Sequence, residues 1–146
     1  MSDDEDKLIL AYAKQLLLLE IEAYDMPREM ETEEKKMVNF FTSSRGRRMF
    51  GMLMVRSGMD ETPMSPSELV TSVGISLNSI NSMITECGDP NWITIERDDR
   101  DFRTLYANKP MIDCWVGYST WIADKSNDLG FGNLDGALRL LRSLAK

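Results

Sequence analysis

The feature that most constrains this chain is a pair of short helical patterns separated by a glycine turn. Ser65–Glu68 supplies an N-cap residue, a proline at the first helical position and an acid in the first turn. Gly74 can take the left-handed conformation that ends a helix, and Ser76 can cap the next one. The pattern therefore predicts helices at 66–73 and about 77–87, with the spacing of a helix-turn-helix.

The second of these helices has two distinct faces. Ile80, Met83 and Ile84 recur at helical spacing and predict the inward face. The outward face carries short polar side chains, namely Asn78, Ser79, Asn81 and Ser82. The sequence at 88–90, Gly-Asp-Pro, stops the helix.

A β-hairpin is predicted immediately after this helix. Residues 92–97 and 103–107 alternate in character as strands do, and the letters DDRD between them form a polar tip. Three arginines surround that tip, which is unusual in a chain of net charge −7. They are Arg97, Arg100 and Arg103.

Helical patterns are expected on both sides of this central region. Residues 3–24 carry a wide leucine-rich stripe, which either packs against a second copy or is buried within one core. A helix start near Thr32 and an apolar face over 45–56, ended by Gly58, precede the helix-turn-helix. Helices over about 110–125 and 134–145 follow the hairpin, with a loop, SNDLGFGN, between them.

Length and composition are those of one globular domain covering residues 1–146. Hydrophobic residues make up 42% of the chain and charged residues 28%. No segment reaches the roughly 18 apolar residues of a membrane span, and the acidic start MSDDED is unlike a secretory signal. We therefore expect a cytoplasmic protein without a membrane partner.

The residue types and motifs that are common in catalytic sites argue against an enzyme. The chain has no histidine, which is the commonest general base and metal ligand, and no phosphate-binding glycine motif. Cys87 and Cys114 lack the spacing of a metal site and have no basic neighbour in sequence, so we interpret them as reduced, partly buried thiols. We expect neither a metal site nor a cofactor.

Two segments resemble the MarR-type transcriptional regulators. GISLNSINSMI, residues 74–84, is similar to that family's turn and recognition helix, and DDRDFR, residues 98–103, resembles its Asp-x-Arg-Asp-x-Arg wing signature. The resemblance implies a mainly α fold with a small β-hairpin wing, a winged helix-turn-helix with flanking dimerisation helices. It places the winged helix-turn-helix at 38–109 and a helical dimerisation region at 1–37 and 110–146.

The family pattern also implies roles for individual residues. A homodimer would bind double-stranded DNA, with the recognition helix in the major groove and Arg100 at the wing tip reaching the duplex. Asp98 or Asp101 would orient a neighbouring guanidinium. The candidate DNA-binding residues are Ser76, Asn78, Ser79, Asn81, Ser82, Arg97, Arg100, Arg103, Arg45, Arg47 and Arg48.

The charge distribution leaves a second class of function open. Residues 59–109 hold nine acidic side chains against four basic ones, and no Lys or Arg lies between Pro66 and Glu96. The alternative is a winged-helix module that binds another protein, as an antirepressor or assembly factor, because fold alone does not fix function. The resemblance also implies a small aromatic effector, whose candidate lining is Met111, Trp115, Tyr118 and Trp121.

Overall fold

The computed structural model describes residues 3–144 and divides into two compact units. The winged unit comprises residues 31–116. The helical unit comprises the chain as far as Met30 together with the chain from Gly117 onward. Helix α6, Lys109–Asp128, begins in the winged unit and ends in the helical unit.

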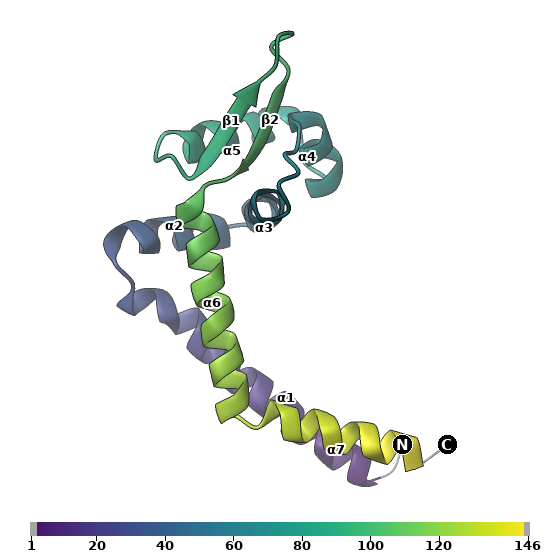
Figure 1. The fold of residues 1–146 in the computed structure, drawn as a ribbon. Helices are drawn as coiled ribbons and strands as arrows, with labels where there is room; N and C mark the ends of the chain where they lie inside the picture. The colour runs from purple at the N-terminus through teal and green to yellow at the C-terminus, as the bar shows by residue number, and fades with distance from the viewer. Residues whose placement is uncertain (1–2, 145–146) are drawn as a thin grey trace. The chain divides into compact units, whose positions relative to one another are not determined.

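The winged unit consists of helices packed against a two-stranded hairpin, whose tip extends beyond them (Figure 1). Its elements are α2 (Thr32–Thr42), α3 (Arg45–Asp60), α4 (Pro66–Val73), α5 (Leu77–Gly88), β1 (Ile93–Arg97), β2 (Arg103–Ala107) and the start of α6. The core is fully buried at Phe50, Met54, Leu69, Ile80 and Leu105. These side chains come from α3, α4, α5 and β2, so the same core holds the helix-turn-helix and the wing.

The local signals of the helix-turn-helix are confirmed. Ser65 Oγ accepts the backbone N–H of Glu68 at 3.2 Å, and Glu68 accepts the backbone N–H of Ser65 at 3.3 Å, which completes a capping box. Gly74 ends α4 with a φ of 78°. Ser76 Oγ accepts the backbone N–H of Ser79 at 3.1 Å and so caps α5.

The hairpin is antiparallel, and the predicted strand at 103–107 has the observed bounds of β2. Arg97 lies opposite Arg103 in the register, on the same face as the buried Ile93 and Leu105. Met64 forms an isolated bridge with Leu105 through backbone hydrogen bonds of 2.9 and 2.7 Å. This bridge ties the hairpin to the loop that follows α3, and local sequence patterns gave no sign of it.

The helical unit contains α1 (Asp3–Asp25), a 3-10 turn η1 (Met26–Glu29), the end of α6 and α7 (Phe131–Leu144). Helices α1 and α7 lie against each other. Their contacts include an edge-to-face pair between Tyr12 and Phe131, with ring centroids 5.0 Å apart. Arg142 Nε also meets Glu5 Oε1 at 2.9 Å. Leu19 is the one buried residue among those of this unit whose side chains the structure describes.

Two sequence expectations about helix ends were wrong. Gly58 does not end α3, which continues to Asp60. A Cβ at Gly58 would lie 2.8 Å from the Ala107 carbonyl oxygen, so this glycine permits the close approach of β2. The predicted loop SNDLGFGN is mostly helical, because α6 continues to Asp128 and α7 begins at Phe131. The turn between them is made at Gly130, whose φ is 75°.

One expected helix extends beyond the residues that the structure describes. The predicted last helix reached Ala145, which lies outside the described residues. Within residues 3–144, no helix is both long and apolar enough to cross a membrane. The same part of the chain shows no group of three or more Cys, Asp or Glu side chains arranged to hold a metal ion.

Candidate nucleic-acid interface

Helix α5 presents a row of short polar side chains. Asn78, Ser79 and Ser82 are exposed, and Asn81 is half-buried. Asn78 and Ser82 have no side-chain partner among the described residues, whereas Ser79 accepts a hydrogen bond from the Ser76 hydroxyl at 3.0 Å. Residues spaced by three and four positions share a helix face, so Asn78, Asn81 and Ser82 form one surface of the exposed side.

Asn81 connects this surface to the wing. Its Oδ1 accepts a hydrogen bond from Nη2 of Arg103, the first residue of β2, at 3.0 Å. Both side chains are partly buried at this contact. The bond joins residues 22 positions apart, so the recognition helix and the hairpin are fixed to each other by a polar contact as well as by the core.

The wing tip is a turn held by one carboxylate. Asp98 Oδ1 accepts the backbone N–H groups of Arg100 at 2.9 Å and Phe102 at 2.8 Å. Asp101, with a φ of 62°, binds Arg97 Nη1 at 2.8 Å. Of the two aspartates expected to orient a guanidinium, Asp101 does so and Asp98 fixes the backbone instead. The Arg100 side chain is exposed and has no partner in the described part of the chain.

A second set of arginines begins α3, where Ser44 Oγ caps the helix by accepting the backbone N–H of Arg47 at 3.1 Å. Arg45 and Arg48 are exposed, without side-chain partners in residues 3–144. A Cβ on Gly46 would come within 3.5 Å of the Ile75 side chain in the helix-turn-helix turn. The start of α3 therefore lies beside the entry to α5.

The Arg47 guanidinium is engaged within the winged unit. Its Nη2 meets Glu86 Oε2 at 3.2 Å, and its Nη1 donates to Ser43 Oγ at 3.0 Å. Its central carbon lies 4.5 Å from the centroid of the Phe40 ring. The sequence made Arg47 a candidate DNA-binding residue and gave no sign of its contact with Glu86, because Glu86 lies 39 residues away.

Apolar side chains also reach the surface near these elements. Leu77, the first residue of α5, is 49% exposed, and Phe102 at the wing tip is 55% exposed. Among the six candidate DNA-binding arginines, Arg47, Arg97 and Arg103 bind side chains of the winged unit. Arg45, Arg48 and Arg100 have no side-chain partner in the described residues. The surface is therefore mixed, with polar, basic and apolar groups.

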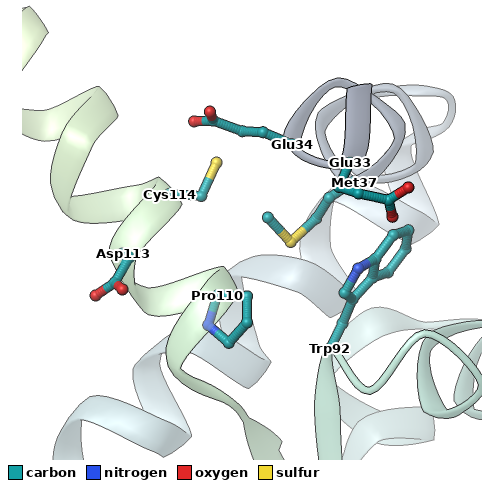
Figure 2. A pocket seen from close by; sticks show the side chains of 7 residues that line it. All are labelled: Glu33, Glu34, Met37, Trp92, Pro110, Asp113 and Cys114. Atoms are coloured by element: carbon teal, nitrogen blue, oxygen red, sulfur yellow. The ribbon is translucent and has the colours of Figure 1, made fainter. Parts of the chain in front are cut away.

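A pocket of about 260 Å³ lies between α2, the start of β1 and the start of α6 (Figure 2). Its lining residues are Glu33, Glu34, Met37, Trp92, Pro110, Asp113 and Cys114. Burial, together with the Glu34 carboxylate, raises the pKa of the Cys114 thiol from 9.0 to about 11. Asp113 is paired with Lys109 and Glu33 with Lys36, which leaves Glu34 as the least compensated charge of the pocket.

The four residues expected to line an effector cleft do not line this pocket. Met111 is buried in the core at 4% exposure. Trp115 lines a different pocket of the winged unit, with Met52, Val55, Arg56, Met59 and Asp60. Tyr118 and Trp121 belong to the helical unit and stack on each other with centroids 6.3 Å apart. The pocket in Figure 2 was missed because its residues come from segments far apart in sequence.

No protein-family model and no curated protein matches the sequence. Its fold does have counterparts among solved structures. The MepR–DNA complex from S. aureus superposes with a TM-score of 0.54 at 10% identity, covering 89% of this chain and 99% of that one. MepR, a transcription regulator of a Staphylococcus aureus multidrug efflux pump, gives a TM-score of 0.51 at 8% identity, covering 88% of this chain and 94% of that one.

MarR from E. coli is also similar, with a TM-score of 0.46 at 11% identity over 100% of this chain and 99% of that one. The two MepR comparisons show that the chain has the winged helix-turn-helix fold of MarR-type regulators. The predicted fold class is thus confirmed. MepR itself is a transcription regulator, and one of its structures holds DNA.

Proposed function

We propose that the protein is a sequence-specific DNA-binding transcriptional regulator of MarR type. In this proposal α5 enters the major groove, and the wing carries Arg100 to the neighbouring backbone or minor groove. The observation that carries it is the combination of an outward row of hydrogen-bonding side chains on α5 with a free guanidinium at the wing tip. MepR, which has the same fold, has a crystal structure in complex with DNA.

The electrostatic part of binding would be local and modest. Arg100 projects from the wing, and Arg45 and Arg48 project from the start of α3, which lies beside α5. Each phosphate neutralised by such a group releases counterions, which makes affinity fall as salt rises. The overall charge of −7 opposes long-range attraction, so we expect weak binding to nonspecific sites and strong dependence on salt.

We propose that the helical unit forms a homodimer. Leu19 is its only buried residue among the side chains described, while Leu17, Ile21, Leu140 and Leu144 are each more than 60% exposed. An amphipathic helix pair with so little core gains stability when a partner covers its apolar side chains. Light scattering at micromolar concentration should give twice the mass of 16.7 kDa, and a monomer would exclude this part of the proposal.

We place the small aromatic effector in the pocket of Figure 2. Trp92 and Met37 offer apolar contact, and the Glu34 carboxylate lies next to the Cys114 thiol (Figure 2). This lining favours a compact aromatic molecule carrying a positive charge, because the uncompensated charge in the pocket is negative. In a protein that carries Trp115→Phe and Trp121→Phe, the fluorescence of Trp92 is observed alone. Its quenching by a cationic dye, absent when Glu34→Gln is added, would support the site, and equal quenching in both proteins would exclude it.

The second candidate is a winged-helix module that binds another protein. Its support is the absence of any Lys or Arg between Pro66 and Glu96 and the 49% exposure of Leu77 at the start of α5. An exposed leucine among acidic and neutral side chains is suited to a protein surface. This candidate predicts no affinity for duplex DNA at any salt concentration.

One titration decides between the two candidates. Fluorescence anisotropy with a labelled 30-base-pair duplex of mixed sequence is measured from 20 to 200 mM salt. The regulator is supported if binding is detectable at low salt and log affinity falls linearly with log salt concentration. Absence of binding at 20 mM salt excludes the regulator and leaves the protein-binding module.

A further inference from the structure

The contact between Arg103 and Asn81 restricts how the recognition helix can read a base. A guanidinium group has only N–H donors and no acceptor, so the oxygen of the Asn81 amide must face Arg103, as the 3.0 Å bond shows. The Nδ2 group then points to the opposite side of the amide. It has no partner among the described residues.

Sheet register explains why Arg103 reaches the helix. Arg103 lies on the same hairpin face as Leu105, which is fully buried in the core shared with Ile80 of α5. Arg97, directly opposite, turns to Asp101 instead. The two arginines of this pair therefore have different partners, and Arg103 is directed to α5.

We propose that Arg103 is a positioning residue that holds Asn81 as a hydrogen-bond donor, so that Asn81 selects a base edge carrying acceptors. This inference rests on the proposed function. Asparagine pairs with adenine by using its oxygen and its NH2 group together. In this protein the bond from Arg103 holds the oxygen on the side of the wing, so the NH2 group is the part of the Asn81 amide that is directed to a base. Guanine offers two acceptors, N7 and O6, in the major groove, whereas cytosine offers a donor, so the expected preference is for guanine and against cytosine.

The neighbouring side chains of α5 differ from Asn81 in having no contact with the wing. Asn78 and Ser82 lie on the same face of α5 and have no side-chain partner in the described chain, so their groups stay free to rotate. Asn81 alone on this face has its orientation set by the wing. Loss of Arg103 should therefore change the base preference at the DNA position that Asn81 contacts. The base preferences at positions contacted by Asn78 or Ser82 should stay unchanged.

The test is selection of binding sites from a duplex library with a randomised central segment, at low salt. Wild type, Asn81→Ala, Arg103→Met, the double variant and the matched control Arg100→Met are compared. Asn81→Ala should lose a guanine preference of roughly tenfold at one position in each half-site, the scale of a good base contact. Arg103→Met should lose the guanine preference at that same position. The double variant should lose no more of this preference than either single variant.

Arg100→Met removes the same charge from the same hairpin, so it should lower affinity without altering the preference. Retention of the wild-type preference by Arg103→Met, additive losses in the double variant, or a preferred adenine or cytosine at that position would overturn the inference. The regulator proposal would survive each of those results. Failure of the wild type to bind any duplex would overturn both.

A second measurement needs no DNA. The side-chain NH2 signals of Asn81, assigned by comparison with Asn81→Ala, should shift in Arg103→Met and stay unchanged in Arg100→Met. Unchanged Asn81 signals in Arg103→Met would contradict the contact itself. Circular dichroism melts of each variant identify any loss of signal that comes from unfolding.

Discussion

Arg47 in α3 and Glu86 in α5 meet with 3.2 Å between Nη2 and Oε2. The same guanidinium lies over the Phe40 ring of α2. One side chain thus joins three helices of the winged unit, and it also compensates Glu86, the one acidic residue within α5. We infer that Arg47 positions the start of α3 against α5, while Arg45 and Arg48 remain available for phosphate.

Replacement of Arg47 should therefore affect stability. Arg47→Ala removes a partly exposed ion pair worth about 0.5 kcal/mol and a cation–π contact worth about 0.5–1 kcal/mol. We expect the free energy of unfolding, measured by urea denaturation, to fall by about 1–1.5 kcal/mol. Arg48→Ala, which removes an exposed charge without a partner, should change it by less than about 0.5 kcal/mol. Equal losses in both variants would contradict the positioning role.

Arg100 should contribute to the affinity for DNA but not to the free energy of unfolding. Arg100→Ala is expected to weaken binding to duplex DNA by about 1–3 kcal/mol and to make the salt dependence shallower by about one unit. Its urea denaturation curve should match that of the wild type, because the side chain has no partner within residues 3–144. Arg139→Ala, which removes one positive charge from α7, is the matched control. An Arg100→Ala protein that binds as tightly as this control would remove the wing from the proposal.

The wing tip should depend on Asp98 and not on Asp99. Asp98→Ala removes the acceptor of the Arg100 and Phe102 backbone N–H groups. A bond to a charged acceptor contributes about 1.5–3 kcal/mol, so hydrogen exchange at these two amides should accelerate by about tenfold or more. Asp99→Ala removes an exposed carboxylate with no partner in the described chain and should leave both rates unchanged. Slow exchange in Asp98→Ala would show that the strands alone hold the turn.

Local signals in the sequence predicted the centre of the fold well. The Ser65 cap, the Gly74 turn and the Ser76 cap act over three or four residues, so each could be interpreted without knowledge of the rest of the chain. Gly58 shows where this approach fails. Its role depends on Ala107, which approaches from a strand 49 positions later, and a sequence pattern cannot distinguish a packing glycine from a helix stop.

The membership of the candidate site stays a prediction, but the structure shows that its residues differ in their contacts. The eleven residues were chosen by type and by resemblance, which treats each arginine as equivalent. Contacts over long sequence separations then assign Arg47 to Glu86 and Arg103 to Asn81. Asp98 also departs from expectation, because its carboxylate binds backbone N–H groups at the tip and Asp101 takes the guanidinium. Such choices between partners are settled by packing, which the sequence alone does not display.

Gly74 provides a test of backbone strain without side-chain clash. A Cβ at this position would have no neighbour within 4 Å, but its φ of 78° lies in the left-handed region. Gly74→Ala should therefore lower the free energy of unfolding by about 1–2 kcal/mol. Gly74→Asn should cost less, since asparagine tolerates this conformation better. A denaturation series in which both variants match the wild type would show that the turn relaxes out of the left-handed region.

The two thiols should be inert at neutral pH and should destabilise the fold in alkali. Burial, with a further contribution from Glu86, raises the pKa of Cys87 from 9.0 to about 12, and that of Cys114 rises to about 11. Because the thiolate is the reactive form, labelling of the native protein by a disulfide reagent at pH 8 should be slow at Cys114 and negligible at Cys87. Rapid labelling would instead support a redox-sensing role.

The same shifts set the direction of the pH dependence. The native state retains its thiol protons after the unfolded chain releases them near pH 9.0, so the free energy of unfolding should fall as pH rises above about 9. The slope per thiol is at most about 1.4 kcal/mol per pH unit. Urea denaturation from pH 8 to 11 should show a shallower fall in Cys87→Ala than in the wild type, whatever stability that variant loses at pH 8. Parallel curves would show that Cys87 ionises as readily in the folded chain as in the unfolded one.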